Sequence, residues 1–395
     1  MPGVLEDIKV LDLSRVVAGP TCAMILGDLG ADIIKVERPG SGDEVRHWGP
    51  PYAGTESVYY LGLNRNKRSL SLNFKSPAGK QVLRRMAREV DVIIENFKTG
   101  DLERAGLGYE DLSRENPALI YCSISGYGRT GPDKNKPGYD FAIQGRGGYM
   151  SITGQPDGPP TKVGLPVIDV LAALNAAVGV FSALRVREAT GRGQLVDVSL
   201  LDAEVSALVN QGSNWLMGGM VPQRWGNANP NVVPYQTFRS MDGWFNVAVG
   251  NNDQFARLCD AIGAPLLAED PRYATNDLRI QNRDALVAAL TEKFRTRPTA
   301  EWLQILSQAK VPTDPIQSID QVFSDPQILA REMLVTMPHP TLGEVRMAGN
   351  AIKLSDNPVS YRRHPPLLGE HTEEVLGEFG HTKEEIRVLR SEGVI

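Results

Sequence analysis

Short apolar runs alternate with helical patterns through the first half of the chain, and this alternation constrains the fold more than any other feature. The apolar runs have the length of buried strands and stand at residues 8–14, 31–38, 91–96, 118–128 and 193–200. A clear helical pattern covers residues 76–90, with Ser76 placed to cap it and Pro77 in its first turn. Strands that alternate with helices predict an α/β domain with a doubly wound, Rossmann-like and largely parallel sheet.

The character of the sequence changes after about Met217. An Asn- and Pro-rich stretch at 224–234 reads as a loop, and the segment after it reads as a hairpin around Asp242-Gly243. Amphipathic patterns for three helices follow. The sequence therefore predicts a second, smaller α+β domain.

Composition excludes several classes of protein. The 395 residues carry a net charge of −5, which argues against a nucleic-acid or anionic-membrane partner. The three cysteines lie far apart in apolar contexts, which indicates a reducing, cytoplasmic location and no disulfide framework. The five histidines show no metal-ligand spacing, so no metal is predicted. The longest apolar run, Val163 to Leu184, is interrupted by Asp169 and Asn175, which argues against a membrane span.

Asp169 stands just after a proline and at the start of a long apolar helical pattern. It can be a helix cap, because aspartate accepts the free N–H groups of a first helical turn. It can also be a nucleophile, because carboxylates form covalent acyl intermediates and a helix start favours their ionised form. The pattern itself leaves both interpretations open.

Phosphate-binding signals are incomplete in this chain. The turn after the first strand, "SRVVAGP", has one glycine where a dinucleotide-binding turn needs three, and no P-loop sequence is present. Arg38, Lys75 and Arg104 instead follow strands or join strands to helices. Because doubly wound sheets bind ligands at that edge, these cations suit a phosphorylated small molecule.

Several segments in a fixed order resemble the class III CoA-transferases, the family of formyl-CoA transferase and carnitine-CoA transferase. They include "VLDLSRVVAGP", "GDLGADIIKVERPGSGDEVRHWGPP", "YYLGLNRNKRSLSLNFKSPAG", "IYCSISGYGRTGP" and "VGLPVIDVLAALNAAVGV", and the likeness extends over essentially the full length. The resemblance implies that Asp169 is the nucleophile, which forms aspartyl mixed-anhydride and aspartyl-CoA thioester intermediates. It implies CoA thioesters as substrates and no bound cofactor.

The resemblance also assigns residues to the site. The implied CoA contacts are Arg15, Val16, Ala18, Arg38, Leu72, Lys75, Asn96, Phe97 and Arg104. The implied neighbours of the nucleophile are Tyr139, Asp140, Gly226, Asn227 and Asn229, the last three from an Asn-rich loop in place of the family's glycine-rich loop. The α-methylacyl-CoA racemases of the same fold have a histidine where Tyr139 stands. A tyrosine is a poor general base at neutral pH, so a racemase is the weaker interpretation.

Residues 224–254 most resemble the subgroup that uses succinyl-CoA with dicarboxylic acids such as glutarate or hydroxymethylglutarate; a formyl-CoA:oxalate-type transferase is the alternative. Candidates for the distal carboxylate are Arg46, Arg65 and Arg224. The family forms interlocked homodimers, which implies a division into a large CoA-binding domain, a linker, the small domain, a second linker and a segment that returns to the large domain. These parts are expected at 1–200, 201–224, 225–330, 331–350 and 351–395.

Overall fold

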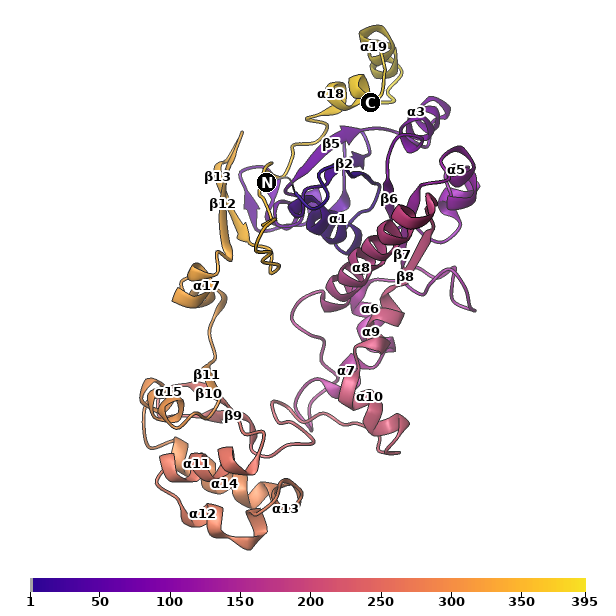
Figure 1. Cartoon of the computed structure of the whole chain (residues 1–395). Coiled ribbons are helices and arrows are strands. Elements are labelled where there is room, and N and C mark those ends of the chain that lie inside the picture. The colour runs from indigo at the N-terminus through magenta and orange to yellow at the C-terminus, as the bar shows by residue number, and fades with distance from the viewer. Residues whose placement is uncertain (1–2) are drawn as a thin grey trace. The chain divides into compact units, whose positions relative to one another are not determined.

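The computed structural model describes residues 3–395 and divides the chain into two compact units (Figure 1). Unit 1 consists of Met1–Tyr149, Val163–Gly219 and Pro326–Ile395, and unit 2 consists of Met150–Lys162 and Met220–Asp325. Each unit is discontinuous in sequence, because the chain leaves the first unit and later returns to it.

Unit 1 is built on a six-stranded sheet with the order β5-β2-β1-β6-β7-β8, in which every neighbouring pair is parallel. The strands are β1 (Lys9–Asp12), β2 (Asp32–Glu37), β5 (Lys67–Ser71), β6 (Val92–Glu95), β7 (Ile120–Ser125) and β8 (Leu195–Ser199). The predicted parallel α/β sheet is thus confirmed. The strand order runs in opposite directions on the two sides of β1, and ligands bind such sheets where the order reverses.

Helices cover both faces of this sheet. One apolar core joins it to α1 (Ala18–Asp28) and α8 (Val167–Thr190). A second core joins it to α3 (Pro77–Ala87), α5 (Tyr109–Glu115), α18 (Thr372–Glu378) and α19 (Lys383–Ser391). The cap predicted at Ser76 is confirmed in α3. Helix α8 ends at Thr190, and the next residue, Gly191, has a positive φ of 69° that suits glycine.

The rest of unit 1 consists of short elements around the sheet. They are η1 (Glu44–His47), β3 (Tyr52–Ala53), β4 (Glu56–Ser57), α2 (Val58–Leu61), α4 (Asp101–Arg104), α6 (Asp140–Arg146), α9 (Leu200–Ser206), α10 (Val209–Leu216), α17 (Pro326–Ala330), β12 (Leu334–His339) and β13 (Gly343–Ala348), while α7 (Tyr149–Ile152) bridges the division.

The two segments expected as linkers contain regular structure. Much of 201–224 is helical, in α9 and α10. Most of 331–350 forms the antiparallel hairpin β12–β13, which packs Val335, Met337, Val345 and Met347 into a small apolar cluster with Leu61. Alternating apolar residues bury one face of this hairpin, and that gives the segment a core of its own.

Unit 2 has a three-stranded antiparallel sheet of order β11-β10-β9 covered by helices over one apolar core. Its elements are β9 (Tyr235–Arg239), β10 (Trp244–Ala248), α11 (Asn252–Ala261), α12 (Leu266–Glu269), η2 (Pro271–Tyr273), α13 (Asn276–Gln281), α14 (Arg283–Phe294), α15 (Thr299–Gln308), β11 (Thr313–Pro315) and α16 (Ile319–Val322). The hairpin predicted around Asp242-Gly243 is confirmed as β9–β10.

Helix α8 is the one helix within residues 3–395 that is long and apolar enough to cross a membrane by length and composition. It packs along α1 and the sheet through buried residues that include Ala172, Ala176 and Ala183. Apolar residues on its other side, including Leu174 and Val178, are exposed in the single chain. The helix therefore has one face in the core of unit 1 and one apolar face without cover.

Candidate active site

Two neighbouring pockets lie in unit 1 where β1, β2 and β6 end. The first, here called the outer pocket, has Arg38, Leu72, Lys75 and Phe97 on its lining. The second, here called the Asp169 pocket, has Asn96, Lys98, Lys136, Tyr139 and Asp169 on its lining. Arg15 and Phe97 line both. The pockets stand at the carboxyl ends of the strands where the strand order reverses, which is the expected ligand site of such a sheet.

Most of the residues assigned by resemblance meet in these two pockets. Those found on the linings are Arg15, Val16, Ala18, Arg38, Leu72, Lys75, Asn96, Phe97, Tyr139 and Asp169. Arg104 is on neither lining; its exposed side chain forms an ion pair with Asp101. Gly226, Asn227 and Asn229 belong to unit 2.

Asp169 does not cap its helix. It is the third residue of α8, whose N-cap position is Pro166. The cap is supplied by Asp140 at the start of α6, whose Oδ1 accepts from Ile168 N at 2.7 Å and from Asp169 N at 3.4 Å. Since Asp140 satisfies these N–H groups, the carboxylate of Asp169 is left free to line the pocket.

A helix start was expected to keep Asp169 ionised, but its pKa is raised in the structure. Burial, followed by the nearby Asp140 carboxylate, raises the pKa of Asp169 to about 7. The same two carboxylates, after burial, raise the pKa of Tyr59. No sequence signal identified Tyr59 as a neighbour of Asp169. Desolvation and a like charge thus outweigh the helix dipole, which is a weaker effect.

The turn between β1 and α1 forms part of both linings and has a strained backbone. Val16 has a φ of +70°, a conformation that is costly for a β-branched residue. Asn96 holds Arg15 on both sides, since its Oδ1 accepts from Arg15 N at 2.8 Å and its Nδ2 donates to Arg15 O at 2.7 Å. Asp43 Oδ1 accepts from Val16 N at 3.2 Å. Surrounding side chains therefore determine the course of this turn.

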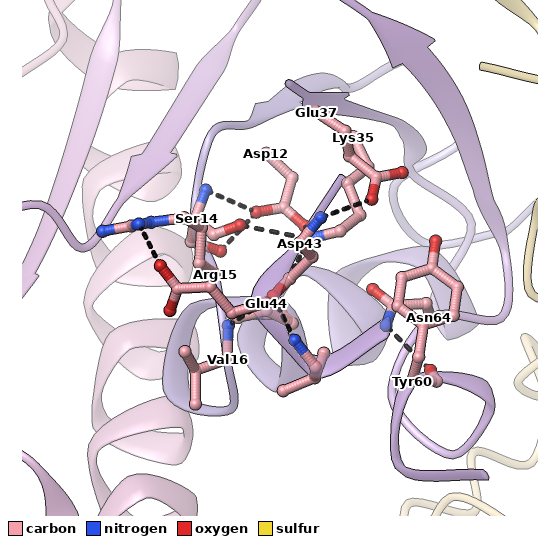
Figure 2. A network of polar contacts seen from close by, with 12 residues as sticks. Asp12, Ser14, Arg15, Val16, Lys35, Glu37, Asp43, Glu44, Tyr60 and Asn64 are labelled. Carbon is pink, nitrogen blue, oxygen red and sulfur yellow. Dashed lines mark hydrogen bonds and ion pairs between the residues drawn. The ribbon is translucent and has the colours of Figure 1, made fainter. Parts of the chain in front are cut away.

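A buried ion network lies under the turn (Figure 2). Lys35 Nζ lies 2.9 Å from Asp43 Oδ2 and donates to Ser14 O at 3.0 Å, while Lys67 Nζ donates to Asp12 Oδ2 at 2.9 Å. The charged side chains are 0–1% exposed. Charges buried so completely persist only when they are paired. The sequence interpretation missed this network, although a lysine inside an apolar strand was a signal.

Two of the three arginines expected to bind a distal carboxylate are occupied inside the fold. Arg46 makes a bidentate pair with Glu37, at 2.8 Å for each bond, and donates to Tyr60. Arg65 makes a bidentate pair with Asp28, at 2.9 and 2.6 Å. Both side chains are under 10% exposed, so the expectation for them is corrected.

Arg224 lies in unit 2 and holds backbone carbonyls of the same unit, with Nη2 2.8 Å from Gly158 O. It remains a candidate, because part of its side chain is accessible. No group of three or more His, Cys, Asp or Glu side chains in residues 3–395 could hold a metal ion, and the three cysteines are free and buried.

A parallel sheet whose strand order reverses beside a pocket defines a doubly wound α/β protein, a class that binds ligands at this place. The profile of CoA-transferase family III matches residues 5–372. The chain is 43% identical to human succinyl-CoA:glutarate CoA-transferase over 99% of this chain and 90% of that protein. It is 41% identical to the succinate–glutarate CoA-transferase of Agrobacterium fabrum, over 95% of each.

Among solved structures, a CaiB/BaiF family protein from Brucella suis matches with a TM-score of 0.85 and 41% identity, over 96% of this chain and all of that one. The chain therefore belongs to CoA-transferase family III and is an enzyme of that family, with CoA thioesters as substrates.

Proposed function

We propose that this enzyme transfers CoA from succinyl-CoA to a dicarboxylic acid such as glutarate, with Asp169 as the covalent nucleophile. The observation that carries the proposal is the position of Asp169, a partly buried carboxylate on the lining of a pocket that adjoins the outer pocket through Arg15 and Phe97. The named relatives, which use succinyl-CoA or succinate with glutarate, support the choice of substrates.

In this proposal, CoA lies along the two pockets. Arg38 and Lys75 are exposed on the outer pocket, and neither has an ion-pair partner within residues 3–395. They are therefore free to bind CoA phosphates, while Leu72 and Phe97 offer apolar surface. Arg104, on α4 just after β6, is retained as a more distant phosphate contact. The thioester end then enters the Asp169 pocket.

The proposed reaction proceeds through four exchanges of acyl groups. The Asp169 carboxylate attacks the succinyl thioester carbon, the C–S bond breaks, and a mixed anhydride and the CoA thiolate form. The thiolate attacks the aspartyl carbonyl of the anhydride, which releases succinate and leaves an aspartyl-CoA thioester. The acceptor carboxylate attacks the carbonyl of this thioester, the C–S bond breaks, and a second mixed anhydride and the free thiolate form. The thiolate then attacks the acceptor acyl carbon, which forms the new acyl-CoA and regenerates Asp169.

The chain's own residues suit this sequence of steps. A carboxylate with a pKa of about 7 is more basic than an ordinary aspartate and still ionised in part at neutral pH. Asp140 orients it by capping α8 through Ile168 N and Asp169 N. The fixed turn at Val16 keeps the wall of the pocket in place, which preorganises the site.

A mass-spectrometric panel tests the substrates. Purified enzyme is incubated with succinyl-CoA and some twenty free acids, and glutarate with its substituted relatives is expected to outrank butyrate and formate. If formyl-CoA with oxalate proves the best pair, the oxalate-type alternative replaces the dicarboxylate assignment. Epimerisation of a 2-methylacyl-CoA without transfer of CoA would identify a racemase. That alternative is disfavoured because Tyr139 would be a poor general base at neutral pH.

Hydroxylamine tests the covalent step separately. Added during turnover, it should modify one side chain, Asp169, because it intercepts the activated aspartyl carbonyl. Asp169→Ala and Asp169→Asn should fold and lose transfer by about 10³-fold or more, as expected for removal of a nucleophile. Full activity of Asp169→Ala would end the proposal.

We also propose a homodimer with interlocked chains, in the cytoplasm, without nucleic-acid or membrane partners and without a cofactor other than its CoA substrates. The support for self-association is apolar surface on α8 and α10. Val178 is 65% exposed, Leu216 81% and Met217 82%. Surfaces of this kind mark sites of protein association, and a second copy is the partner that the family resemblance names.

A further inference from the structure

Glu95 is a buried carboxylate at the end of β6, directly before a loop that lines both pockets. Its side chain is 4% exposed, and it is on the lining of neither pocket. Four residues of the loop that follows line the Asp169 pocket, and they are Asn96, Phe97, Lys98 and Thr99. Since a carboxylate is costly to enclose without partners, Glu95 depends on the groups around it.

The Glu95 carboxylate joins this loop to the neighbouring strand β7. Its Oε2 accepts from Phe97 N at 2.8 Å, so the side chain holds the backbone of the loop. Its Oε1 lies 3.9 Å from Nη1 of Arg129, a residue in the segment after β7. The same Nη1 donates to Ser123 Oγ on β7 at 3.1 Å. The start of the loop is thus fixed relative to β7.

Arg129 extends the connection to the far end of the loop. Its Nη2 pairs with the carboxylate of Glu103 on α4, the residue before Arg104. Arg129 is thus placed between two glutamates, and hydrogen bonds between charged groups are stronger than neutral ones. Glu95 and Arg129 together hold residues 96–104 at both ends.

The Phe97 ring belongs to the wall that the two pockets share. Its centroid lies 5.8 Å from that of Phe74 and 4.8 Å from the guanidinium carbon of Arg15, and both of these residues line the outer pocket. The hydrogen bond from Phe97 N to Glu95 fixes the backbone that carries this ring. The position of the wall therefore depends on a carboxylate outside the pockets.

We propose that Glu95 is a positioning residue for CoA: as an ionised carboxylate paired with Arg129, it holds residues 96–104 in the conformation that CoA binds, without contact to CoA itself. The inference rests on the proposed placement of CoA along the two pockets. A proton on Glu95 removes the ion pair and weakens the bond from Phe97 N, because charge-assisted hydrogen bonds are the stronger ones. The affinity for CoA should therefore follow the ionisation of a residue outside the pockets.

The groups around Glu95 place its titration near neutral pH. Burial raises the pKa of Glu95 to about 7. Hydrogen bonds from Ser123 and Phe97 N, then the charge of Arg129, act in the opposite direction. The charge of Glu103 adds to the rise.

Three further titratable groups face this cluster, and they are Tyr121 and Cys122 of β7 and Asp197 of β8. Burial raises the pKa of Tyr121 and of Cys122 well above the ordinary values, so both are neutral near pH 7. Asp197 Oδ2 accepts from the backbone N of Arg129 at 3.3 Å and not from the guanidinium group that pairs with Glu95. The titration that affects this pair near pH 7 therefore belongs to Glu95.

Titration calorimetry with free CoA tests the proposal without turnover. All proteins carry Asp169→Asn, so that the other carboxylate with a pKa of about 7 does not contribute. Glu95→Gln keeps the shape and cannot ionise, so it should weaken CoA binding about tenfold at pH 8, as for a lost bond to a charged group, and change it little at pH 6. Titration of CoA itself is common to the proteins compared and cancels.

The matched control is Asp91→Asn, at the opposite end of β6. Asp91 makes the same two kinds of contact, since Oδ2 accepts from Lys9 N at 2.8 Å and Oδ1 pairs with Arg187 at 2.8 Å. Its CoA affinity should equal that of the parent at both pH values. Hydrogen–deuterium exchange of residues 96–104 should increase in Glu95→Gln and in Arg129→Met, which removes the partner instead of the buried acid, and not in Asp91→Asn.

Three results would overturn the inference: no loss of CoA affinity in Glu95→Gln at pH 8, an equal loss at pH 6 and pH 8, or an equal loss in Asp91→Asn. An equal loss at both pH values would mean that the side chain acts by shape and not by charge. Arg38→Ala tests the placement of CoA separately. If Arg38→Ala weakens CoA binding and Glu95→Gln does not, the placement stands and the positioning role is wrong. If Arg38→Ala binds CoA like its parent, the placement is wrong and the inference fails with it.

Discussion

Asp169 and Asp140 work as a pair in which the second aspartate determines the properties of the first. Asp140 provides the helix cap that Asp169 would otherwise supply, and its charge adds to burial in raising the pKa of Asp169. Two carboxylates with different surroundings can therefore take different tasks, one structural and one chemical.

The pH profile is the first prediction at this scale. Only ionised Asp169 attacks a thioester, so kcat/KM for succinyl-CoA should fall about tenfold per pH unit below a pKa of about 7 and level off above it. Asp140→Asn keeps a cap oxygen and removes the charge, so the inflection should move to lower pH. Asp111→Asn, which alters an exposed pair with Arg114, is the control and should leave the inflection in place. If the inflection stays at the same pH in Asp140→Asn, the charge of Asp140 does not raise the pKa of Asp169.

The same shift has a consequence for stability. The folded-state pKa of Asp169 is above its ordinary value of 3.8, so between these two values the native protein binds more protons than the unfolded chain. The contribution of Asp169 to stability is therefore present at low pH and is lost as pH rises from about 4 to about 7. Asp169→Asn should accordingly raise Tm relative to the wild type at pH 8 and not at pH 4, by about 2 °C for each kcal/mol in a chain of this size. Calorimetry at the two pH values measures the difference.

At the scale of elements, the ends of β1 and β2 are joined through charged side chains in addition to their apolar contacts. Lys35 of β2 bonds both Asp43, before η1, and the carbonyl of Ser14, after β1. Gly19 of α1 allows close approach to the same turn, because a Cβ there would stand 2.1 Å from the Cβ of Ser14. These contacts explain how a strained residue such as Val16 persists at the pocket.

Removal of Lys35 should therefore cost much stability. Lys35→Met leaves the Asp43 carboxylate buried without its cation, which typically costs about 3–5 kcal/mol. Urea unfolding measures this loss. Arg185→Met breaks an exposed pair with Glu188 and should cost about 1 kcal/mol or less. Equal losses in the two variants would show that the network contributes no more than a surface pair.

The loops after β2 and β5 supply the proposed phosphate contacts, which gives a second prediction for elements. Arg38→Ala and Lys75→Ala should each weaken the binding of all CoA esters by about tenfold, whatever the acyl group, because both residues line the outer pocket. Titration calorimetry with CoA and several acyl-CoAs measures the effect, and Arg114→Ala is the control. A loss restricted to some acyl groups would place these residues at the acyl end instead.

At the scale of the whole molecule, a single chain leaves apolar side chains of α8 and α10 exposed. Helix α8 buries one face in the core of unit 1 and exposes Leu174, Val178 and Val186 on the other. Trp215, Leu216 and Met217 at α10 are exposed as well. A chain with this much uncovered apolar surface is expected to associate.

Light scattering should give twice the chain mass of 43.1 kDa at all concentrations that can be measured. Interlocked chains cannot separate without unfolding, so dilution should not produce monomers. If the fraction of monomer increases on dilution, the chains form a dimer that dissociates, and the interlocked form is excluded. A monomer at every concentration would remove the dimer altogether.

Local patterns in the sequence determined a large share of this protein. Local patterns predicted five of the six parallel strands of unit 1 and the hairpin β9–β10, because each depends on residues near one another in the chain. The edge strand β5 was missed, because its segment is rich in basic residues. The resemblance assigned Asp169, and most of the CoA contacts that it assigned lie on the linings of the two pockets, since motifs keep their order along the chain.

Tertiary structure alone decided which polar groups meet. Arg46 and Arg65 look in sequence like free cations, yet Glu37 and Asp28 pair with them inside the fold. Asp140 caps a helix that begins far along the chain, and the pKa of Asp169 follows from that approach and from burial. Burial and charge pairing depend on distances in space, which short-range patterns do not contain, so the sequence pointed to Asp169 while the fold determined its charge state and its partners.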